Sequence, residues 1–493
     1  MKKILYSSLI IFFLTLIVVG SSFIIKTDFF AERKKDTPNI VLIFMDDLGY
    51  GDLSSYGATD YRTPNLDRMA AEGVRFTHFL AAQAVCSASR SALLTGCYPN
   101  RVGFSSALFP ASKVGINADE MTLAQLLKQK NYATAIFGKW HLGDNKKFLP
   151  LQHGFDEYFG IPYSNDMWPV WYDGKPASPE QKGKYQFPPL PLIEGNEKIG
   201  EVKTLDDQAL LTKRLTERAT DFIKKNKKKP FFLYVPHPMP HVPINASPAF
   251  KGKSKQGLYG DVMMEMDWSV GEILKTLKDY GLDKNTLVIF TSDNGPWLNF
   301  GNHAGSSGGL REGKGVSFEG GLRVPCLMRW KGTVPEGLVC NQLTSTIDIL
   351  PTIAALCDVQ LPKNPIDGVN MLPILRGDME NQPRTYFYYY YRRNDLQAVR
   401  KDHWKLVLPH KGRSYIGQLP GIDGFPGTAR EDISHPQGLY DLRRDPAEAY
   451  DVQKLYPEIL AELLNVAETA REDLGDDITK REGKNRRPSG KLE

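Results

Sequence analysis

Short, continuous apolar runs alternate with amphipathic segments along most of the chain. The clearest runs cover residues 39–45, 132–137, 230–235 and 286–291, and residues 261–282 have the periodicity of a helix. Strands that are apolar throughout and separated by helices are typical of a sheet covered on both faces. The pattern therefore predicts an α/β fold with a large, mostly parallel sheet flanked by helices.

The pattern changes after about residue 380. Three segments resemble neighbouring antiparallel strands and a fourth resembles a helix: residues 386–391, 396–400 and 403–408, and residues 457–471. We therefore expect an N-terminal domain over residues 37–380 and a smaller C-terminal α+β domain with an antiparallel sheet over residues 381–493. The basic tail from Lys480 contains Gly and Pro and is expected to fray.

Residues 161–205 are rich in Pro, Trp and Tyr and have weak periodicity. Long irregular segments of this kind are usually surface excursions or walls of a binding cleft. We expect this one to help select the substrate.

The N-terminus has the pattern of an export signal. Lys2 and Lys3 precede an apolar run that extends to Ile25. The run contains small residues suited to a cleavage site, and its length is close to that of a bilayer span. Residues 1–26 are therefore predicted to be a signal peptide or an uncleaved signal anchor, with membrane contact only in the second case. The rest of the chain is expected to be periplasmic, secreted or lumenal.

Composition excludes several classes of protein. The chain has 493 residues, 41% apolar and 24% charged, with a formal net charge of +5. This excludes collagen-like, coiled-coil and wholly disordered chains. The charge is small for this length, so nucleic acid is not an expected partner. Five cysteines are an odd number for an exported chain, so at least one cannot form an intramolecular disulfide.

Acidic and amide side chains follow two of the predicted strands. Asp46 and Asp47 come directly after the first strand, and Asp293 and Asn294 follow the last. Because ligands bind beyond the carboxyl ends of strands in open parallel sheets, both pairs are expected to face one crevice. Taken singly, the same residues also fit a helix cap and a turn. Together their oxygen atoms predict a site for a hard divalent cation, Ca²⁺ or Mg²⁺.

Cationic and imidazole side chains follow the two other strands and suit an anionic substrate. Lys139 and His141 follow the second apolar run, and His237 and His241 follow the third. Lys314 lies between glycines, which let a backbone come close to a ligand. Single residues of this kind are more often structural, so the prediction depends on their meeting at one edge of the sheet.

A Cys-Ser-Ala-Ser-Arg sequence marks the predicted start of a short helix. The helix would begin near Cys86 and end at Gly96, with Ser87 or Ser89 as its N-cap. A helix N-terminus favours negative charge, and Arg90 lies one turn later on the same face. The alternative is a buried cysteine in a capped helix.

Two other cysteine chemistries do not fit this segment. A thiolate phosphatase needs Cys-x5-Arg with a glycine-rich cradle, whereas the spacing here is Cys-x3-Arg. A cysteine protease would not explain an oxygen-lined metal site beside the cysteine.

Six motifs resemble those of the type I sulfatases and occur in the same order. The segment from Cys86 to Gly96 resembles the Cys-x-Pro-Ser-Arg and Leu-Thr-Gly signature of that family, with Ala88 in place of Pro. The other motifs are Asp46-Asp47, Gly138-Lys139-Trp140-His141, the Pro-His-Val-Pro around His241, Ser292-Asp293-Asn294-Gly295 and Lys314. Residues 439–446 also resemble the C-terminal domain of arylsulfatase A-like members. The resemblance implies an alkaline-phosphatase-like fold with its catalytic domain at residues 37–380.

The resemblance further implies that a formylglycine-generating or maturase enzyme oxidises Cys86 to Cα-formylglycine, which hydrates to a geminal diol. One diol oxygen would coordinate Ca²⁺, with Mg²⁺ as the alternative. The other ligands would be Asp46, Asp47, Asp293 and Asn294. The coordinated oxygen would attack sulfur in line and expel the alcohol. Sulfate would then leave by elimination and the aldehyde would return.

The same resemblance assigns roles to the cationic residues. Arg90 and His141 would hold and deprotonate the diol. The residues that would bind sulfate oxygens and assist departure of the alcohol are Lys139, His241 and Lys314. We also expect His303, just after the metal turn, to contact substrate.

The predicted activity is hydrolysis of sulfate monoesters, and the expected substrate is a sulfated small molecule or glycan. A sulfated carbohydrate is the first choice, because exported enzymes meet such polymers. One alternative is an alkaline-phosphatase-like phosphoesterase, but those enzymes usually have a Ser or Thr nucleophile and two zinc ions, and this chain has only nine His. The other is an exported sulfated-glycan-binding protein without turnover.

Overall fold

Ten strands form one mixed sheet in the part of the chain that the computed structural model describes, residues 37–492. The predicted export segment, residues 1–26, lies outside the described residues. In sheet order the strands are β12 (Leu338–Cys340), β2 (Val74–Phe76), β11 (Cys326–Arg329), β10 (Thr286–Ser292), β1 (Asn39–Met45), β9 (Phe231–Pro236), β5 (Ala133–Lys139), β6 (Glu157–Ile161), β7 (Leu190–Glu194) and β8 (Glu197–Val202).

The five central strands of this sheet, β10, β1, β9, β5 and β6, are parallel. β11 and β7 pair antiparallel with the two ends of this block. Met45 pairs with Ser292, so the chain leaves β1 and β10 at the same level of the same edge. The predicted large, mostly parallel sheet is confirmed, and it places Asp46 and Asp293 side by side.

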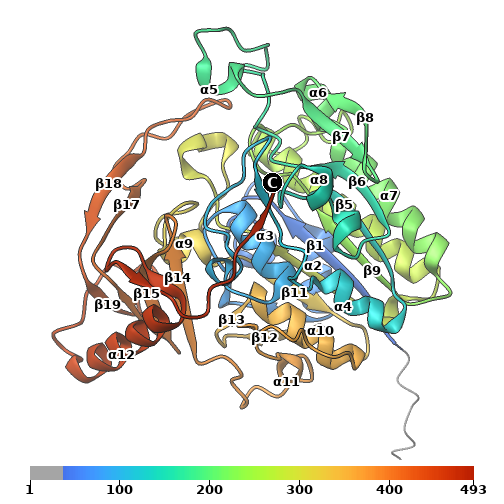
Figure 1. Cartoon of the computed structure of the whole chain (residues 1–493). Coiled ribbons are helices and arrows are strands. Elements are labelled where there is room, and N and C mark those ends of the chain that lie inside the picture. The colour runs from blue at the N-terminus through green and yellow to red at the C-terminus, as the bar shows by residue number, and fades with distance from the viewer. Residues whose placement is uncertain (1–36, 493) are drawn as a thin grey trace, which may run out of the picture. The chain divides into compact units, whose positions relative to one another are not determined.

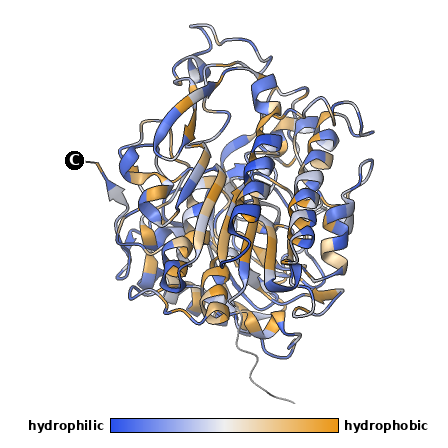
Figure 2. Ribbon diagram, turned by 90° about the vertical axis from the view of Figure 1, so that its right-hand side faces the viewer, coloured by the Kyte–Doolittle hydropathy of each residue, from blue (hydrophilic) through white to orange (hydrophobic). Residues whose placement is uncertain are grey.

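Helices cover both faces of the sheet, as Figure 1 shows. Alternate residues of β1 enter two separate cores: Ile40 and Leu42 pack on one face, and Val41 and Ile43 on the other. The helices with residues in the first core are α3 (Cys86–Thr95), α4 (Leu123–Leu127) and α10 (Ile349–Cys357). Those in the second are α2 (Pro64–Ala71), α7 (Leu211–Asn226) and α8 (Leu258–Asp279). Figure 2 shows the apolar strands lying behind helices that carry hydrophilic residues.

A second, antiparallel sheet follows in the chain and has its own helix. It consists of β14 (Tyr386–Tyr391), β15 (Asp395–Lys401), β16 (Trp404–Val407) and β19 (Gly438–Asp441), with α12 (Pro457–Leu474) against it. A hairpin of β17 (His410–Ser414) and β18 (Arg430–His435) stands beside it. Its core also contains Leu80, Ala92 and Leu322 from the larger part, and residues from Pro38 on form one compact unit. The division into residues 37–380 and 381–493 therefore stays a prediction.

Shorter elements connect these layers. They are β3 (Phe79–Leu80), β4 (Val114–Gly115), α5 (Lys182–Tyr185), α6 (Leu205–Ala209), α9 (Glu319–Leu322), β13 (Thr344–Ser345), α11 (Leu372–Leu375), β20 (Gly475–Asp476), β21 (Arg481–Glu482) and β22 (Gly490–Lys491).

Two expectations about irregular segments need correction. Residues 161–205 are not wholly irregular, because β7 and β8 form an antiparallel hairpin that extends the main sheet. The tail does not fray: β22 pairs with β4, and the Arg487 guanidinium binds both carboxylate oxygens of Glu120. Paired backbone and a bidentate ion pair hold the tail against the body. Across residues 37–492, none of the helices combines the length and apolar character needed to cross a membrane.

A buried histidine predicts how stability depends on pH. The ring of His153 stacks on Trp140 with 6.1 Å between centroids, and neither ring nitrogen has a hydrogen-bond partner in the described part of the chain. Burial lowers the pKa of His153 to about 4. In the unfolded chain His153 is protonated below about pH 6.5, whereas in the folded chain it stays neutral down to about pH 4. The folded state therefore loses stability as the pH falls from about 6.5 to about 4.

Replacing His153 with leucine should reduce this acid sensitivity. The free energy of unfolding, measured by urea titration at pH 7 and pH 5, should change less with pH in the variant than in the wild type. The difference should approach about 1.4 kcal/mol per pH unit at most. Equal pH dependence in both proteins would contradict the assignment.

Candidate active site

Three carboxylates and one amide meet where β1 and β10 end. Asp46, Asp47, Asp293 and Asn294 are all at most 4% exposed. The Asp47 backbone N–H donates to Asp293 Oδ1 at 3.1 Å, and Asn294 Nδ2 donates to Asp47 Oδ1 at 2.7 Å. Asp47 has a φ of 62°, which is unusual for a residue other than glycine and is common at functional sites. The predicted oxygen-rich cluster is therefore present.

Three cationic side chains neutralise these carboxylates. The Lys139 ammonium contacts Asp46 and donates to Ser164 Oγ. Arg90 donates from Nε and Nη2 to Asp293 Oδ2, at 3.1 and 2.8 Å. Lys314 Nζ lies 2.8 Å from each oxygen of Asp47. These contacts bring together side chains that lie far apart in the sequence, from Asp46 to Lys314.

Cys86 begins helix α3 beside this cluster. Its Sγ lies 3.5 Å from Asp46 Oδ1, and the helix ends at Gly96 with a φ of 69°, as predicted. The predicted serine N-cap is wrong. The N-cap is Val85, without a side-chain hydrogen bond, because the Ser87 hydroxyl instead accepts the Leu108 backbone N–H at 2.9 Å.

Two histidines, His141 and His241, lie at the same site, and a hydrogen bond to a backbone carbonyl fixes which ring nitrogen of each carries the proton. His141 Nε2 lies 2.9 Å from the Leu108 carbonyl, so it must donate, and Nδ1 is buried without a hydrogen-bond partner among the described residues. Burial, helped by Lys139 and Arg90, holds the pKa of His141 well below its usual range, so the ring is neutral at pH 7. His241 donates from Nδ1 to the Val242 carbonyl, which leaves Nε2 facing Asp47 at 3.5 Å.

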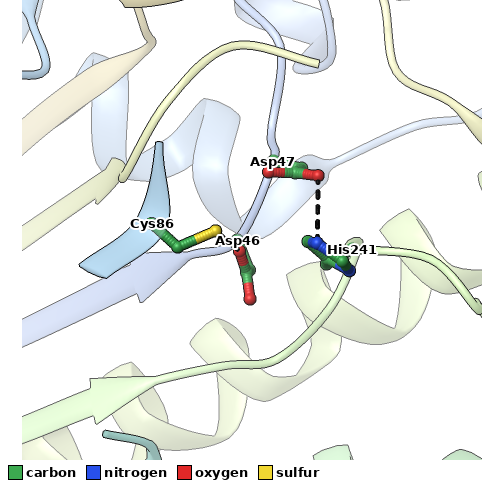
Figure 3. Close-up of side chains that lie close together, drawn as sticks. All are labelled: Asp46, Asp47, Cys86 and His241. Atoms are coloured by element: carbon green, nitrogen blue, oxygen red, sulfur yellow. Dashed lines mark hydrogen bonds and ion pairs between the residues drawn. The ribbon is translucent and has the colours of Figure 1, made fainter. Parts of the chain in front are cut away.

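The cluster has the donors that a divalent cation requires. Ligand atoms of Asp46, Asp47, Cys86 and His241 all lie within 4.8 Å of one another. Figure 3 shows these four side chains around one small space, with Cys86 directed toward Asp46. In addition, Asn294 Oδ1 is buried and has no hydrogen-bond partner within residues 37–492. Buried oxygens need a partner, and a hard cation satisfies several at once, so the residues fit such an ion.

The pKa values of Asp46 and Asp293 are shifted in opposite directions. Burial would raise the pKa of Asp46, but Lys139 and Arg90 hold it well below its usual range. Burial and the Asp46 carboxylate raise the pKa of Asp293 to about 7, despite Arg90. Burial also raises the pKa of the Cys86 thiol, so the unmodified side chain is protonated and a poor nucleophile.

A cavity of about 650 Å³ opens above Cys86, within the usual size range of ligand sites. Four of the predicted residues line it: Cys86, His141, His241 and Lys314. Arg90 and Lys139 lie behind the carboxylates and are 0% exposed. His303 is not among the lining residues; it is only partly buried, next to Gly424 in the β17–β18 loop.

Residues 161–205 and the C-terminal part of the chain also line the cavity. The part of residues 161–205 that lines the cavity consists of Ser164, Asp166, Met167 and Phe187. The C-terminal sheet and hairpin contribute Tyr391, Arg392, Arg393 and Arg413. The four residues from 161–205 form part of the cavity wall, and the role of that segment in selecting the substrate stays a prediction.

Sequence reasoning missed Trp297 and the three arginines. The Trp297 ring lies 4.5 Å from Lys314 Nζ and 5.6 Å from the His241 ring, so it supports both side chains. Its position shortly after Asp293 and Asn294 was the available signal. The arginines had none, because they lie on loops and edges of a separate sheet.

Family models match nearly all of the described chain. The model described as "Sulfatase" matches residues 38–359. The model "N-sulphoglucosamine sulphohydrolase, C-terminal" matches residues 313–411, and "C-terminal region of aryl-sulfatase" matches residues 382–491.

Named proteins resemble the chain over most of their length. Arylsulfatase A of Bos taurus is 40% identical over 441 residues, covering 87% of this chain and 85% of the relative. N-acetylgalactosamine-6-sulfatase of Canis lupus familiaris is 40% identical over 456 residues, covering 87% and 84%. The crystal structure of the PsFucS1 sulfatase from Pseudoalteromonas sp. aligns with a TM-score of 0.78 and 29% identity, over 88% of this chain and 89% of that one.

Proposed function

Since the chain belongs to the sulfatase family as a type I, arylsulfatase A-like sulfuric ester hydrolase, we propose that it removes sulfate from a sulfated carbohydrate at the side chain of residue 86. The observation that carries this proposal is the position of Cys86, 3.5 Å from Asp46 at the floor of a substrate-sized cavity. An acidic cluster alone would fit many enzymes, but a modifiable cysteine within it fits few.

We propose that Cys86 is converted to Cα-formylglycine and that a divalent cation, Ca²⁺ or Mg²⁺, is held by Asp46, Asp47, Asp293 and Asn294. With the cation bound, the hydrated aldehyde at residue 86 would supply a hydroxyl of low proton affinity, and the cation would supply a positive charge beside it. Conversion requires a formylglycine-generating or maturase enzyme as a partner. The raised pKa of the buried Cys86 thiol supports the modification, because a protonated thiol is a poor nucleophile.

His141 is the proposed proton acceptor at residue 86. Its Nε2–H is committed to the Leu108 carbonyl, so only Nδ1 can take a proton. The lowered pKa keeps the ring neutral and able to do so. Arg90 acts through position, because its two hydrogen bonds fix the Asp293 carboxylate that faces the cation.

Lys314 and His241 are the proposed contacts to sulfate. Both line the cavity and approach Asp47 from the substrate side. Negative charge spreads over the outer and leaving oxygens during cleavage, so fixed cations are worth more there than in water. Lys139 is fully buried against Asp46, and its positive charge balances the charge of the carboxylates. We keep a substrate contact by His303 only as a prediction.

The proposed substrate class rests on the cavity and the relatives. The relatives include an enzyme named for N-acetylgalactosamine-6-sulfate, and aromatic side chains at Phe109, Phe187 and Trp297 line the cavity of this chain. Aromatic faces suit the apolar face of a sugar ring. The N-terminal pattern supports an exported location, where sulfated polymers are found.

Release of inorganic sulfate tests the proposal. The purified protein should release sulfate from an aryl sulfate and from sulfated oligosaccharides, and should release no phosphate from the matching phosphate esters at a comparable rate. Protein with verified formylglycine that releases sulfate from none of these esters would contradict the proposed function and favour a binding protein.

Replacing Lys314 with glutamine should reduce kcat/KM for sulfate release by roughly 10²–10³, because one of the cations that face the sulfate oxygens is lost. The matched control is Lys275→Gln, which removes another Lys–Asp ion pair from an exposed face of α8. Steady-state kinetics on the aryl sulfate measures both. Equal activity of the two variants would contradict the role of Lys314.

A further inference from the structure

A strained, strongly basic turn lies at the mouth of the cavity. The turn joins β14 to β15 and places Arg392 and Arg393 in the left-handed region, with φ values of 48° and 68°. Turns of this conformation favour Asn, Asp and Gly, because a larger side chain is strained there. Two consecutive arginines are therefore not what the turn itself requires.

The surrounding structure holds the turn in this conformation. Asn100 Nδ2 donates to the Arg393 carbonyl at 2.9 Å and to Asn394 Oδ1 at 2.8 Å. Asn394 Nδ2 in turn donates to the Leu474 carbonyl. Strain that is fixed from outside in this way is a mark of functional sites.

The two turn residues share the cavity with a third arginine, Arg413 of β17. We call Arg392, Arg393 and Arg413 the arginine rim. A side chain at Gly315 would meet Arg413 Nη1 at 3.2 Å, so this guanidinium lies directly against the residue after Lys314. The rim is therefore next to the cation that we place on the reacting sulfate.

Acidic neighbours form ion pairs with two of the three rim arginines. Glu431 and Asp432 pair with Arg392, and Glu431 also pairs with Arg413. Arg393 is exposed and forms no ion pair with any of residues 37–492. Among residues 37–492, Asp166 is the only acidic side chain that lines the cavity above the cluster, and it is already paired with Lys184.

Part of the cavity lining is aromatic. Phe109 and Phe187 stack with 6.3 Å between their centroids, and both line the cavity. A ligand that fits this space has an apolar face toward the phenylalanines and a negative group toward the rim. A sugar chain with a second anionic group has both features.

We propose that the arginine rim, Arg393 above all, binds a second anionic group of the glycan whose sulfate ester reacts at residue 86. This rests on the proposed function and narrows its substrate to polyanionic glycans. The second group is a sulfate or a carboxylate, since a guanidinium binds either through paired N–H donors.

Three oligosaccharides that share one scissile sulfate test the proposal: one with no other charge, one with a second sulfate and one with a carboxylate. Wild-type kcat/KM should be at least about tenfold higher for one or both doubly charged substrates, and the preference should shrink with added salt. The substrate that gains more identifies the second group. Equal kcat/KM for all three would overturn the proposal.

Arg393→Asn separates binding from strain. Asparagine suits the left-handed turn, so the variant should keep or gain thermal stability while the preference for doubly charged substrates falls roughly tenfold, mainly through KM. Arg393→Lys should retain part of the preference. The control Arg444→Asn removes an arginine that is 83% exposed and is not a lining residue, and it should leave the preference unchanged.

Different results would contradict the role of the arginine rim and the proposed function. An Arg393→Asn variant that slows all three substrates equally, or none of them, would overturn the role of the rim while sulfate release continues. Absence of sulfate release from every substrate by wild-type protein would contradict the proposed function, and the inference with it.

Discussion

Replacing Cys86 with alanine is expected to lower sulfate release by at least about 10⁴-fold, because it removes the proposed nucleophile. Sγ of this residue lies 3.5 Å from Asp46 Oδ1, and the residue lines the cavity. The small change in volume at the start of α3 should leave the fold intact. Initial rates on the aryl sulfate, with circular dichroism as the check on folding, measure the effect.

The matched control is Cys340→Ala. Cys340 is also buried and free, and it lies on the edge strand β12 away from the cavity. This variant should keep nearly full activity. Comparable loss in both variants would mean that cysteine removal acts through stability, and substantial activity in Cys86→Ala would exclude residue 86 as the nucleophile.

Asp47→Asn should be the second most damaging change and should act through the cation. It keeps the left-handed backbone at φ 62°, which asparagine tolerates, but removes a charge that Lys314 and His241 both face. We expect loss of bound divalent cation and a fall in kcat/KM of roughly 10³. Metal content after desalting, by atomic spectroscopy, gives a readout independent of activity.

Asp60→Asn is the control for this substitution. Asp60 has a similar φ of 66° but is exposed in a loop, so the change should affect neither metal content nor rate. Wild-type cation content in Asp47→Asn would contradict the proposed ligand set.

The central strands could be predicted closely because they are buried on both faces. Residues 39–45 form β1 with the predicted bounds, and a polar pair follows at once. The parallel order then forces the acidic residues to one edge, which is why Asp46 and Asp293 could be placed together from the pattern alone. The helix from Cys86 to Thr95 followed from its αL glycine end.

The edges and the tail could not be predicted, because they depend on partners far away in the chain. β8 is mostly exposed and polar, and β7 is a short segment that contains a proline. The tail is held by Arg487 on Glu120, 367 residues earlier. Ser87 failed as a cap because the Leu108 backbone, which no local pattern reveals, takes its hydroxyl.

The rim shows the same limit within the candidate site. Arg392 and Arg393 look like a solvated turn in the sequence, and only the packing of the second sheet brings them to the cavity. Cationic residues that follow strands of the main sheet, such as Lys139, could be predicted; those contributed by another sheet could not.

Mass spectrometry of the peptide that contains Cys86, taken from protein that releases sulfate, tests the central claim most directly. The account predicts a mass about 18 Da below that of the unmodified thiol peptide, as expected for conversion of the cysteine to an aldehyde. The extent of this conversion should rise and fall with specific activity across preparations. Fully active protein in which residue 86 is an unmodified thiol would contradict it.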